Sequence, residues 1–365
     1  MSSASSPNGP QSALALHFEK NPPKSICIVM LSAIGDAVHV LPVATALKRR
    51  WPAVKITWVI QPVPHLLVKD HPAIDEFLIY QRRRGMGSWK GFSELKRQFP
   101  KEPFDLLIGL QVYFKAGMLT ALAPAKIKLG FDKARARDMN WLFTNERIPA
   151  RGQRHVQDQY FEFLEHIGID PRPPVWGIEL SDAEREQQAV FMAPIDQPIC
   201  AVVVGTSKPA KNWTAEGYAR VLDEVEAKHG LRPVLVGGPS PIEREIADGI
   251  LAKSKARVID ALGNDLRKLV WLIEASALVI SPDTGPLHIA RALDRPVVGL
   301  FGYTNPKRVG PYQKYEELMV DGYALTPDEE YGISAEYRDG MKRVTPEMVM
   351  EKVELAMDLH VRGTP

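Results

Sequence analysis

Four residues that could contribute to a ligand site stand at the junction between an apolar run and an expected helix: Asp283, Thr284, Gly285 and His288. The run 277–280 stops at a Ser-Pro-Asp-Thr-Gly-Pro turn, and Pro286 favours a helix that begins at about Gly285. The free N–H groups and the positive dipole end of a helix attract an anion, and glycine permits close approach. The pattern therefore predicts an anion site, with the alternative that Asp283 or Thr284 only caps the helix.

A second acidic residue follows the first apolar run of the chain. Residues 24–31 are expected to form a buried strand, and a helix is expected over 38–50. Asp36 lies in the small-residue turn between them, where its side chain would point from the first strand-to-helix loop into a cleft. The alternative is that Asp36 caps the helix.

The pattern of strand and polar loop restarts in the second half of the chain. The run 199–204 opens into Thr206 and Ser207, whose hydroxyls can bond phosphate oxygens, and Lys211 follows them. A solvated loop lysine is the alternative for Lys211. After the next expected strand, Glu243 fits a capping box with Ser240, which explains it without a ligand.

The spacing of apolar runs predicts an α/β protein with two similar halves. Further strands are expected at 56–60, 77–80, 104–110 and 127–130 in the first half and at 233–236 and 258–260 in the second. We expect a disordered tail over 1–23, a first domain over 24–170, a linker over 171–198 and a second domain over 199–345. The apolar stripe of a final helix over 346–365 suits either a return to the first domain or packing on its own domain.

Three segments resemble the heptosyltransferases of lipopolysaccharide core synthesis, which form glycosyltransferase family 9. They are LSAIGDAVHVLPVATALK, Lys211-Asn212-Trp213-Thr214 and DTGPLHIARALDRPVVGLFGYTNP. The sequence departs from the family at Met30, where a basic residue is frequent, and at Tyr303 and Asn305, where Pro and Asp are frequent. The resemblance implies a GT-B type fold, in which two Rossmann-like βαβ domains face each other across a cleft.

The resemblance also implies an activity: inverting transfer of heptose from ADP-heptose to the inner core of lipopolysaccharide. Asp36 would be the general base, Lys211 would meet the donor diphosphate, and Glu243 would lie against the nucleoside. With these, the expected donor-binding residues are Thr206, Ser207, Asp283, Thr284, Gly285 and His288. A nucleotide-sugar epimerase or a non-catalytic nucleotide-sugar-binding protein of the same fold remains open. An NAD-dependent oxidoreductase is disfavoured because no Gly-x-Gly-x-x-Gly follows either first strand.

Charge is divided unevenly along the chain. Residues 1–170 hold 23 Lys and Arg against 15 Asp and Glu, a balance of +8, whereas residues 171–365 hold 23 against 29, a balance of −6. This asymmetry favours an anionic acceptor for the first half, held by basic loops. The expected acceptor-binding residues are Arg82, Arg83, Arg84, Lys133, Arg135 and Arg137.

Composition limits the remaining possibilities. No apolar run approaches the roughly 18 residues needed to span a bilayer, and the first residues do not resemble a signal peptide. We therefore expect a cytoplasmic protein, with peripheral placement at the inner membrane surface left open. Cys27 and Cys200 lie inside apolar runs and should be buried free thiols. No Asp-x-Asp pair stands at a strand end, so no metal cofactor is expected.

Overall fold

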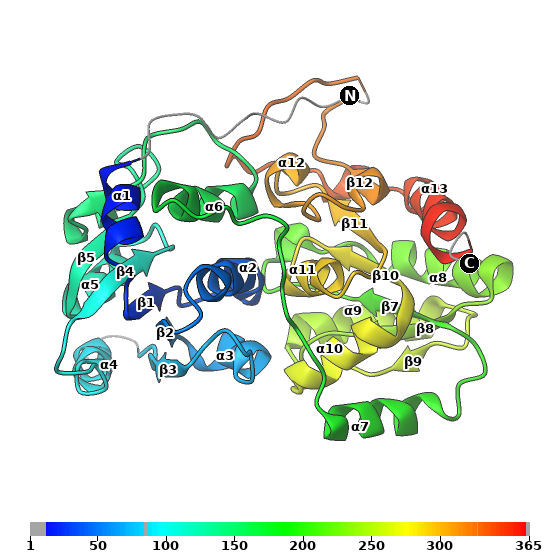
Figure 1. Cartoon of the computed structure of the whole chain (residues 1–365). Helices are drawn as coiled ribbons and strands as arrows, with labels where there is room; N and C mark the ends of the chain where they lie inside the picture. The colour runs from blue at the N-terminus through cyan, green and yellow to red at the C-terminus, as the bar shows by residue number, and fades with distance from the viewer. Residues whose placement is uncertain (1–11, 84–86, 327, 363–365) are drawn as a thin grey trace. The chain divides into compact units, whose positions relative to one another are not determined.

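Two compact units make up the chain in the computed structural model, which describes residues 12–83, 87–326 and 328–362. Unit 1 comprises residues 1–152 and 157–177, and unit 2 comprises residues 153–156 and 178–365. The boundary lies at Gly177, within the expected linker, and the rest of that linker belongs to unit 2, where its helix α7 (Asp182–Met192) contacts α10 (Leu266–Ala275) (Figure 1).

Unit 1 is built on a parallel sheet with the strand order β3-β2-β1-β4-β5-β6. Its strands are β1 (Ser25–Val29), β2 (Lys55–Ile60), β3 (Glu76–Ile79), β4 (Phe104–Gly109), β5 (Ala125–Gly130) and β6 (Glu146–Arg147). Its helices are α1 (Ala13–Lys20), α2 (Ile34–Arg50), α3 (Pro62–Val68), α4 (Gly87–Lys96), α5 (Phe114–Leu122), the short η1 (Asn140–Phe143) and α6 (Val156–His166). Helices α2 and α3 lie on one face of the sheet, and α4 and α5 lie on the other (Figure 1).

Unit 2 repeats this topology with the order β12-β11-β10-β7-β8-β9, again with all pairs parallel. Its strands are β7 (Ile199–Val203), β8 (Arg232–Val236), β9 (Ile259–Asp260), β10 (Ser276–Pro282), β11 (Val297–Phe301) and β12 (Met319–Asp321). Its helices are α7 (Asp182–Met192), α8 (Ala215–His229), α9 (Pro241–Lys253), α10 (Leu266–Ala275), α11 (Gly285–Ala292), α12 (Pro306–Val309) and α13 (Pro346–Ala356), with short turns η2 (Pro209–Lys211), η3 (Glu316–Leu318), η4 (Met341–Arg343) and η5 (Met357–Val361).

The central strands explain why both units fold in this way. In β1 the residues from Ile26 to Val29 are fully buried, and in β7 the residues from Ile199 to Val203 are buried, as expected for strands covered by helices on both faces. Cys27 and Cys200 are buried free thiols, as predicted. Burial raises the pKa of both thiols, that of Cys200 to about 12, so both stay protonated and inert.

Helix α1 corrects the expectation that residues 1–23 are disordered. Ser12 caps the helix by accepting a hydrogen bond from the N–H of Ala15, and its hydroxyl donates to the carbonyl of His166. Phe18 is 2% exposed and meets Trp51 edge-on at 5.8 Å. The described part of the tail is therefore anchored to unit 1, whereas residues 1–11 lie outside the described residues.

The final helix packs within unit 2. Helix α13 contacts α8, β11 and β12, and its inward side chains, such as Val349 and Val353, are fully buried. Of the two placements open for this helix, the structure shows the one on its own domain. Within the described residues, no helix is both long enough and apolar enough to cross a membrane.

Candidate functional site

Four loops of unit 2 meet at one edge of its sheet. They follow β7, β8, β10 and β11, which are neighbours in the order β11-β10-β7-β8 and run parallel. Their carboxyl ends therefore share an edge, the position at which open α/β sheets bind ligands. All of the expected donor-binding residues lie in these loops or in the first turn of the helix that follows.

Asp283 is the centre of this edge. Its side chain is 8% exposed, and Oδ2 accepts hydrogen bonds from Nζ of Lys211 at 2.5 Å and from the hydroxyl of Thr304 at 2.5 Å. Lys211 also donates to the Asp283 carbonyl at 3.1 Å, and Nε2 of His288 lies 3.9 Å from Oδ1. The structure thus joins Asp283, Lys211 and His288, which the sequence predicted separately, and adds Thr304, which it did not.

Helix α11 begins at Gly285, as predicted, and its N-terminus is adjacent to the Asp283 cluster. Thr284 is the N-cap residue in an extended conformation, but its side chain makes no capping hydrogen bond. The carboxylate of Asp283 is bonded to Lys211 and Thr304. The alternative in which Thr284 caps the helix through its side chain is therefore wrong, and the helix terminus keeps its positive end beside a lysine.

The loop after β7 is fixed by its own side chains. The N–H of Thr206 donates to Oδ1 of Asn212 at 2.7 Å. The Thr206 hydroxyl donates to the Lys208 carbonyl at 2.9 Å and accepts from the Lys208 N–H at 3.1 Å. Thr206 is buried, whereas Ser207 is exposed. This turn carries Lys211 to Asp283, so Lys211 is not a solvated loop lysine.

Glu243 lies at the carboxyl end of β8. Its Oε1 accepts from the N–H of Gly238 at 2.7 Å, and its Oε2 accepts from the Ser240 hydroxyl at 2.6 Å. Ser240 in turn caps α9 by accepting from the N–H of Glu243. A Cβ atom on Gly238 would lie 3.0 Å from the carboxylate, so glycine allows this close approach. Ser240 caps α9 as the predicted capping box requires, but the Glu243 carboxylate bonds the Gly238 N–H and the Ser240 hydroxyl instead of the Ser240 N–H, so the reciprocal half of the box is absent.

Asp36 occupies the equivalent edge of unit 1, after β1. It is the third residue of α2, and its Oδ2 accepts from the N–H of Ala33, the N-cap residue, at 2.8 Å. Its Oδ1 accepts from the hydroxyl of Tyr160 at 3.3 Å. Asp36 therefore contributes to the helix start, although not as the N-cap residue, while its carboxylate stays partly exposed.

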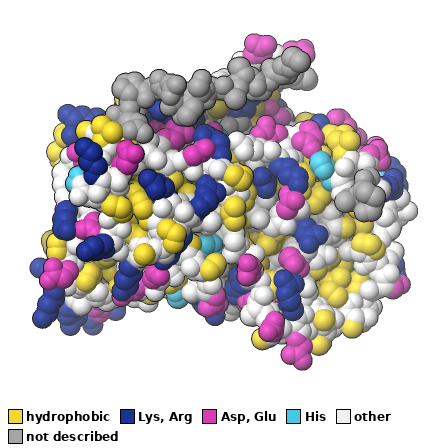
Figure 2. Space-filling model, in the orientation of Figure 1, with side chains coloured by type: hydrophobic (Ala, Val, Ile, Leu, Met, Phe, Trp, Pro, Cys, Tyr) yellow, Lys and Arg dark blue, Asp and Glu magenta, His cyan; other side chains and the backbone are white. Residues whose placement is uncertain are grey.

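The predicted acceptor-binding residues separate into two groups. Arg82, Lys133 and Arg137 are exposed, as is Arg83, which pairs with Glu94 at 3.2 Å. Lys133 lies 4.5 Å from the ring centre of Trp141, and Arg137 lies 5.9 Å from that of Tyr113. Figure 2 shows Lys and Arg side chains gathered over unit 1 at the left of the view. Arg84 lies outside the described residues.

Arg135 corrects the prediction for its loop. Its side chain is 4% exposed and donates to Asp132 at 2.5 Å, to Glu162 at 2.7 Å and to the carbonyl of Pro149 at 3.0 Å. A guanidinium is buried only when such partners satisfy it. Arg135 is therefore part of the core of unit 1 and is not available to an acceptor.

Among the described residues, no group of three or more His, Cys, Asp and Glu side chains is arranged to hold a metal ion. Positive charge at the candidate site comes from Lys211 and from the start of α11.

Comparison with known families identifies the family of this chain. The sequence profile of glycosyltransferase family 9 (heptosyltransferase) matches residues 92–336. The chain belongs to glycosyltransferase family 9. It is therefore an enzyme of the glycosyltransferase class, and the family predicted from its three segments is confirmed.

Individual relatives of this family 9 enzyme support the same family assignment. The chain is 33% identical to the lipopolysaccharide core heptosyltransferase OpsX of Haemophilus influenzae, over 85% of this chain and 88% of that protein. It is 26% identical to lipopolysaccharide heptosyltransferase 1 of Pseudomonas aeruginosa, over 83% and 85% of the two chains.

Solved structures confirm the GT-B type fold of the family 9 chain. A family 9 glycosyltransferase from Veillonella parvula superposes with a TM-score of 0.76 at 24% identity, covering 92% of this chain and 97% of that one. The E. coli heptosyltransferase WaaC, solved with ADP, gives 0.70 at 22% identity, covering 93% and 99%. A putative UDP-N-acetylglucosamine 2-epimerase from Listeria monocytogenes gives 0.54 at 13% identity, covering 92% and 88%, which reflects the fold alone.

Proposed function

We propose that this enzyme transfers heptose from ADP-heptose to a sugar of the lipopolysaccharide inner core, with inversion at the anomeric carbon. One observation carries the proposal: Lys211 and the start of α11 converge at Asp283, on the ligand edge of unit 2. A lysine beside a helix N-terminus suits a diphosphate, because both supply positive charge and N–H donors. The names of the relatives in Haemophilus influenzae and Pseudomonas aeruginosa support heptose as the sugar.

The reaction requires a base on one side of the sugar and a stabilised leaving group on the other. The acceptor hydroxyl forms a bond to the anomeric carbon of the heptose as the bond from that carbon to ADP breaks. Asp36 takes the hydroxyl proton, and a positioned base of this kind contributes about 10²- to 10⁴-fold in rate. Lys211, His288 and the N–H of Gly285 stabilise the charge that develops on the departing diphosphate.

Glu243 completes the donor site in this proposal. Its carboxylate lies at the end of β8, held by the N–H of Gly238 and the hydroxyl of Ser240. A carboxylate held in this position can accept hydrogen bonds from the hydroxyls of a nucleoside ribose. Thr206 shapes the intervening loop, and Ser207 offers an exposed hydroxyl to a phosphate oxygen.

The acceptor is anionic in this proposal and is held by exposed cations of unit 1. Arg82, Arg83, Lys133 and Arg137 remain candidates, whereas Arg135 is excluded by its burial. Charge-assisted hydrogen bonds from such side chains suit phosphate and carboxylate groups. An acceptor of this kind is part of a lipid-anchored molecule, so in this proposal the enzyme acts at a membrane surface.

A nucleotide panel tests the donor. ADP should raise the melting temperature more than UDP, GDP or NAD, because a ligand that binds only the folded state at 100 times its Kd adds about 2.7 kcal/mol. With ADP-heptose and an inner-core acceptor, transfer should persist in excess chelator, because Lys211 and the helix terminus already face the leaving group. Preferential stabilisation by UDP or NAD, or a complete loss of transfer that magnesium restores, would contradict the proposal.

A further inference from the structure

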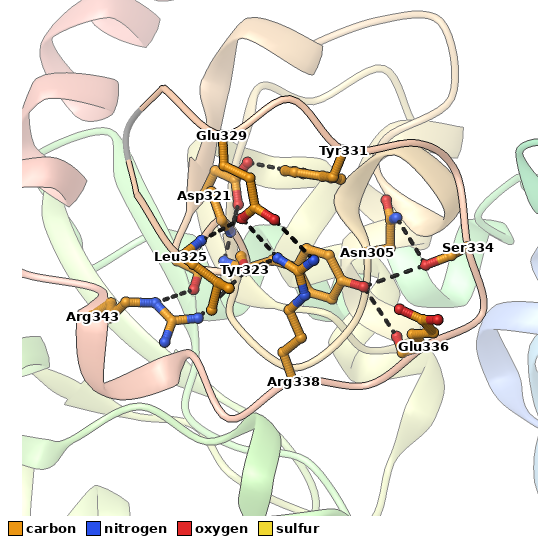
Figure 3. Close-up of polar contacts among 12 residues, drawn as sticks. Asn305, Asp321, Tyr323, Leu325, Glu329, Tyr331, Ser334, Glu336, Arg338 and Arg343 are labelled. Atoms are coloured by element: carbon orange, nitrogen blue, oxygen red, sulfur yellow. Dashed lines mark hydrogen bonds and ion pairs between the residues drawn. The ribbon is translucent and has the colours of Figure 1, made fainter.

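Residues 322–326 and 328–343, which follow β12, form an extension of unit 2 with its own polar network (Figure 3). Arg338 is its centre. The guanidinium makes two hydrogen bonds to Glu329, at 2.8 and 3.0 Å, and a third to the Tyr323 carbonyl at 3.0 Å. It also lies 4.3 Å from the ring centre of Tyr323. The cation–π contact and the bidentate ion pair together hold Tyr323, Glu329 and Arg338 against one another.

Further contacts fix the extension to the carboxyl edge of the sheet. The hydroxyl of Tyr331 donates to Asp321, the last residue of β12 (Figure 3). Asn305, which caps α12, donates from Nδ2 to the carbonyl of Gly332 at 2.8 Å. The extension is thus attached to the end of β12 and to the loop that follows β11.

Three glycines fasten the base of the extension to the end of β11. The N–H of Gly322 donates to the Phe301 carbonyl at 2.7 Å, and the N–H of Gly340 donates to the Gly302 carbonyl at 2.8 Å. A Cβ atom on Gly302 would lie 2.3 Å from the backbone nitrogen of Met341. One on Gly340 would lie 2.1 Å from the carbonyl oxygen of Gly322. Only glycine permits this contact of backbone on backbone.

Beyond this base, the extension pairs with residues 303 and 304, which follow β11. The N–H of Arg338 donates to the Tyr303 carbonyl at 2.9 Å, and Thr304 forms an antiparallel bridge with Tyr337. The rings of Tyr303 and Tyr337 stack at 4.8 Å with 18° between their planes. The backbone of Thr304 is therefore set by the extension, and its buried side chain donates to Oδ2 of Asp283.

We propose that Thr304, held in place by the extension, is a positioning residue for Lys211 in the donor-diphosphate site. The hydroxyl of Thr304 and the ammonium group of Lys211 share one oxygen of Asp283. Thr304 thereby fixes the orientation of the Asp283 carboxylate and limits how tightly that carboxylate holds Lys211. The inference rests on the proposed function, because it assigns Thr304 a role in the binding of the diphosphate by Lys211.

The physical reason is competition for a buried carboxylate. A buried carboxylate oxygen requires donors, and removing one leaves the remaining donor more strongly bound. Without the Thr304 hydroxyl, Oδ2 of Asp283 would depend on Lys211 alone. The lysine, which also donates to the Asp283 carbonyl, would then be less able to turn toward a diphosphate.

A double-mutant cycle on the full chain tests this role. Thr304→Val keeps the side-chain shape and removes the hydroxyl, and should weaken ADP binding about tenfold by calorimetry. Thr304→Ser keeps the hydroxyl and should bind ADP within about twofold of the unmodified enzyme. In a Lys211→Ala background, Thr304→Val should change ADP affinity little, because the residue through which it acts is absent.

A substitution within the extension provides a second, independent test. Arg338→Gln should weaken ADP binding in the otherwise unmodified enzyme but not in the Thr304→Val background. Arg257→Gln is the matched control: Arg257 pairs with Glu226 and with Gln197, which precedes β7 and so lies at the opposite edge of the sheet. This control should leave ADP affinity unchanged. Arg338 does not contact Asp283. If Thr304→Val does not fold, Arg338→Gln therefore still decides whether the extension acts on the donor site.

The outcomes separate this inference from the proposed function. If the unmodified enzyme does not bind ADP, the proposed function fails and this inference fails with it. If it binds ADP but Thr304→Val has no effect, or the effects of Thr304→Val and Lys211→Ala add fully, the donor site stands and the positioning role is wrong. An equal loss in Thr304→Ser and Thr304→Val would also overturn it, because the hydroxyl would not then be the operative group.

Discussion

In the proposed function, the Asp36 carboxylate serves structure and chemistry at the same time. Its Oδ2 accepts from the N-cap N–H of α2, and its Oδ1 faces the hydroxyl of Tyr160. Capping uses the carboxylate only as a hydrogen-bond acceptor, whereas proton transfer uses its basicity. A substitution that keeps the acceptor and removes the basicity therefore distinguishes the two functions.

Asp36→Asn is that substitution, because asparagine accepts a hydrogen bond through Oδ1 but is a very poor base. We expect the melting temperature and ADP affinity to be retained and turnover to fall by at least about a hundredfold. Asp105→Asn is a matched control. Asp105 accepts from the N–H groups of Lys24 and Ser25 at the opposite end of β1, so this variant should keep its turnover. A folded Asp36→Asn enzyme with normal turnover would leave Asp36 with a purely structural role and would remove it as the base.

The structure also shows which side-chain roles sequence reasoning can reach. Asp283 and His288 were predictable because they stand at a strand end and in the first turn of a helix, and Lys211 was predictable from its resemblance to a family segment; the topology then brings the three together. Arg135 was predicted wrongly because one partner, Glu162, is 27 residues away in the chain. Thr304 was missed because its function depends on a contact with Asp283, 21 residues away, that no local pattern shows.

At the scale of elements, long apolar segments were predictable and short polar ones were not. Strands such as β1 and β7 consist of buried apolar residues. The edge strand β6 has only Glu146 and Arg147, both exposed, so it carries no apolar signal. Helix α1 was missed because it adjoins a segment rich in Ser and Pro, and its order comes from tertiary contacts through Phe18 and Ser12.

Helix α7 shows how polar contacts can attach an element that buries none of its own residues. Glu184 forms a two-fold ion pair with Arg267 of α10, at 2.5 and 2.8 Å. Gln188 donates to the Trp271 carbonyl at 2.7 Å. The hydrogen bonds from Arg267 lower the pKa of Glu184 to about 2, against an ordinary value of about 4.5.

The lowered pKa of Glu184 predicts a pH-dependent contribution to stability. A carboxylate whose pKa is depressed on folding stabilises the folded state above its unfolded pKa, and this contribution is lost as pH falls through the folded pKa. Glu184→Gln should therefore reduce the free energy of unfolding at pH 7 by about 1 to 3 kcal/mol. The difference from the unmodified protein should shrink between about pH 4.5 and pH 2. Urea titrations across this range measure it, and a difference that does not depend on pH would show that the ion pair is not its source.

At the scale of the whole molecule, the two units repeat one topology and differ in charge. Both sheets have the same strand order, with six parallel strands each. Residues 1–170 carry a balance of +8 and residues 171–365 a balance of −6. The cations of unit 1 that we propose for acceptor binding are exposed, whereas Lys211 and Asp283 in unit 2 are largely buried. The two substrates should therefore respond differently to ionic strength.

Salt should raise the KM for the acceptor more than the KM for the donor. Exposed charges are screened over a Debye length of about 10 Å at 0.1 M salt, and buried pairs are screened much less.

The double variant Lys133→Gln with Arg137→Gln should raise the acceptor KM at low salt, reduce its dependence on salt and leave ADP affinity unchanged. The control is Lys228→Gln with Lys253→Gln, which removes two exposed cations from unit 2 and should alter neither KM. Arg135→Gln should instead lower stability, because it leaves Asp132 and Glu162 buried without their partner. If the Lys133 and Arg137 variant changed only the donor KM, the basic loops of unit 1 would belong to donor binding, and the assignment of one substrate to each unit would be wrong.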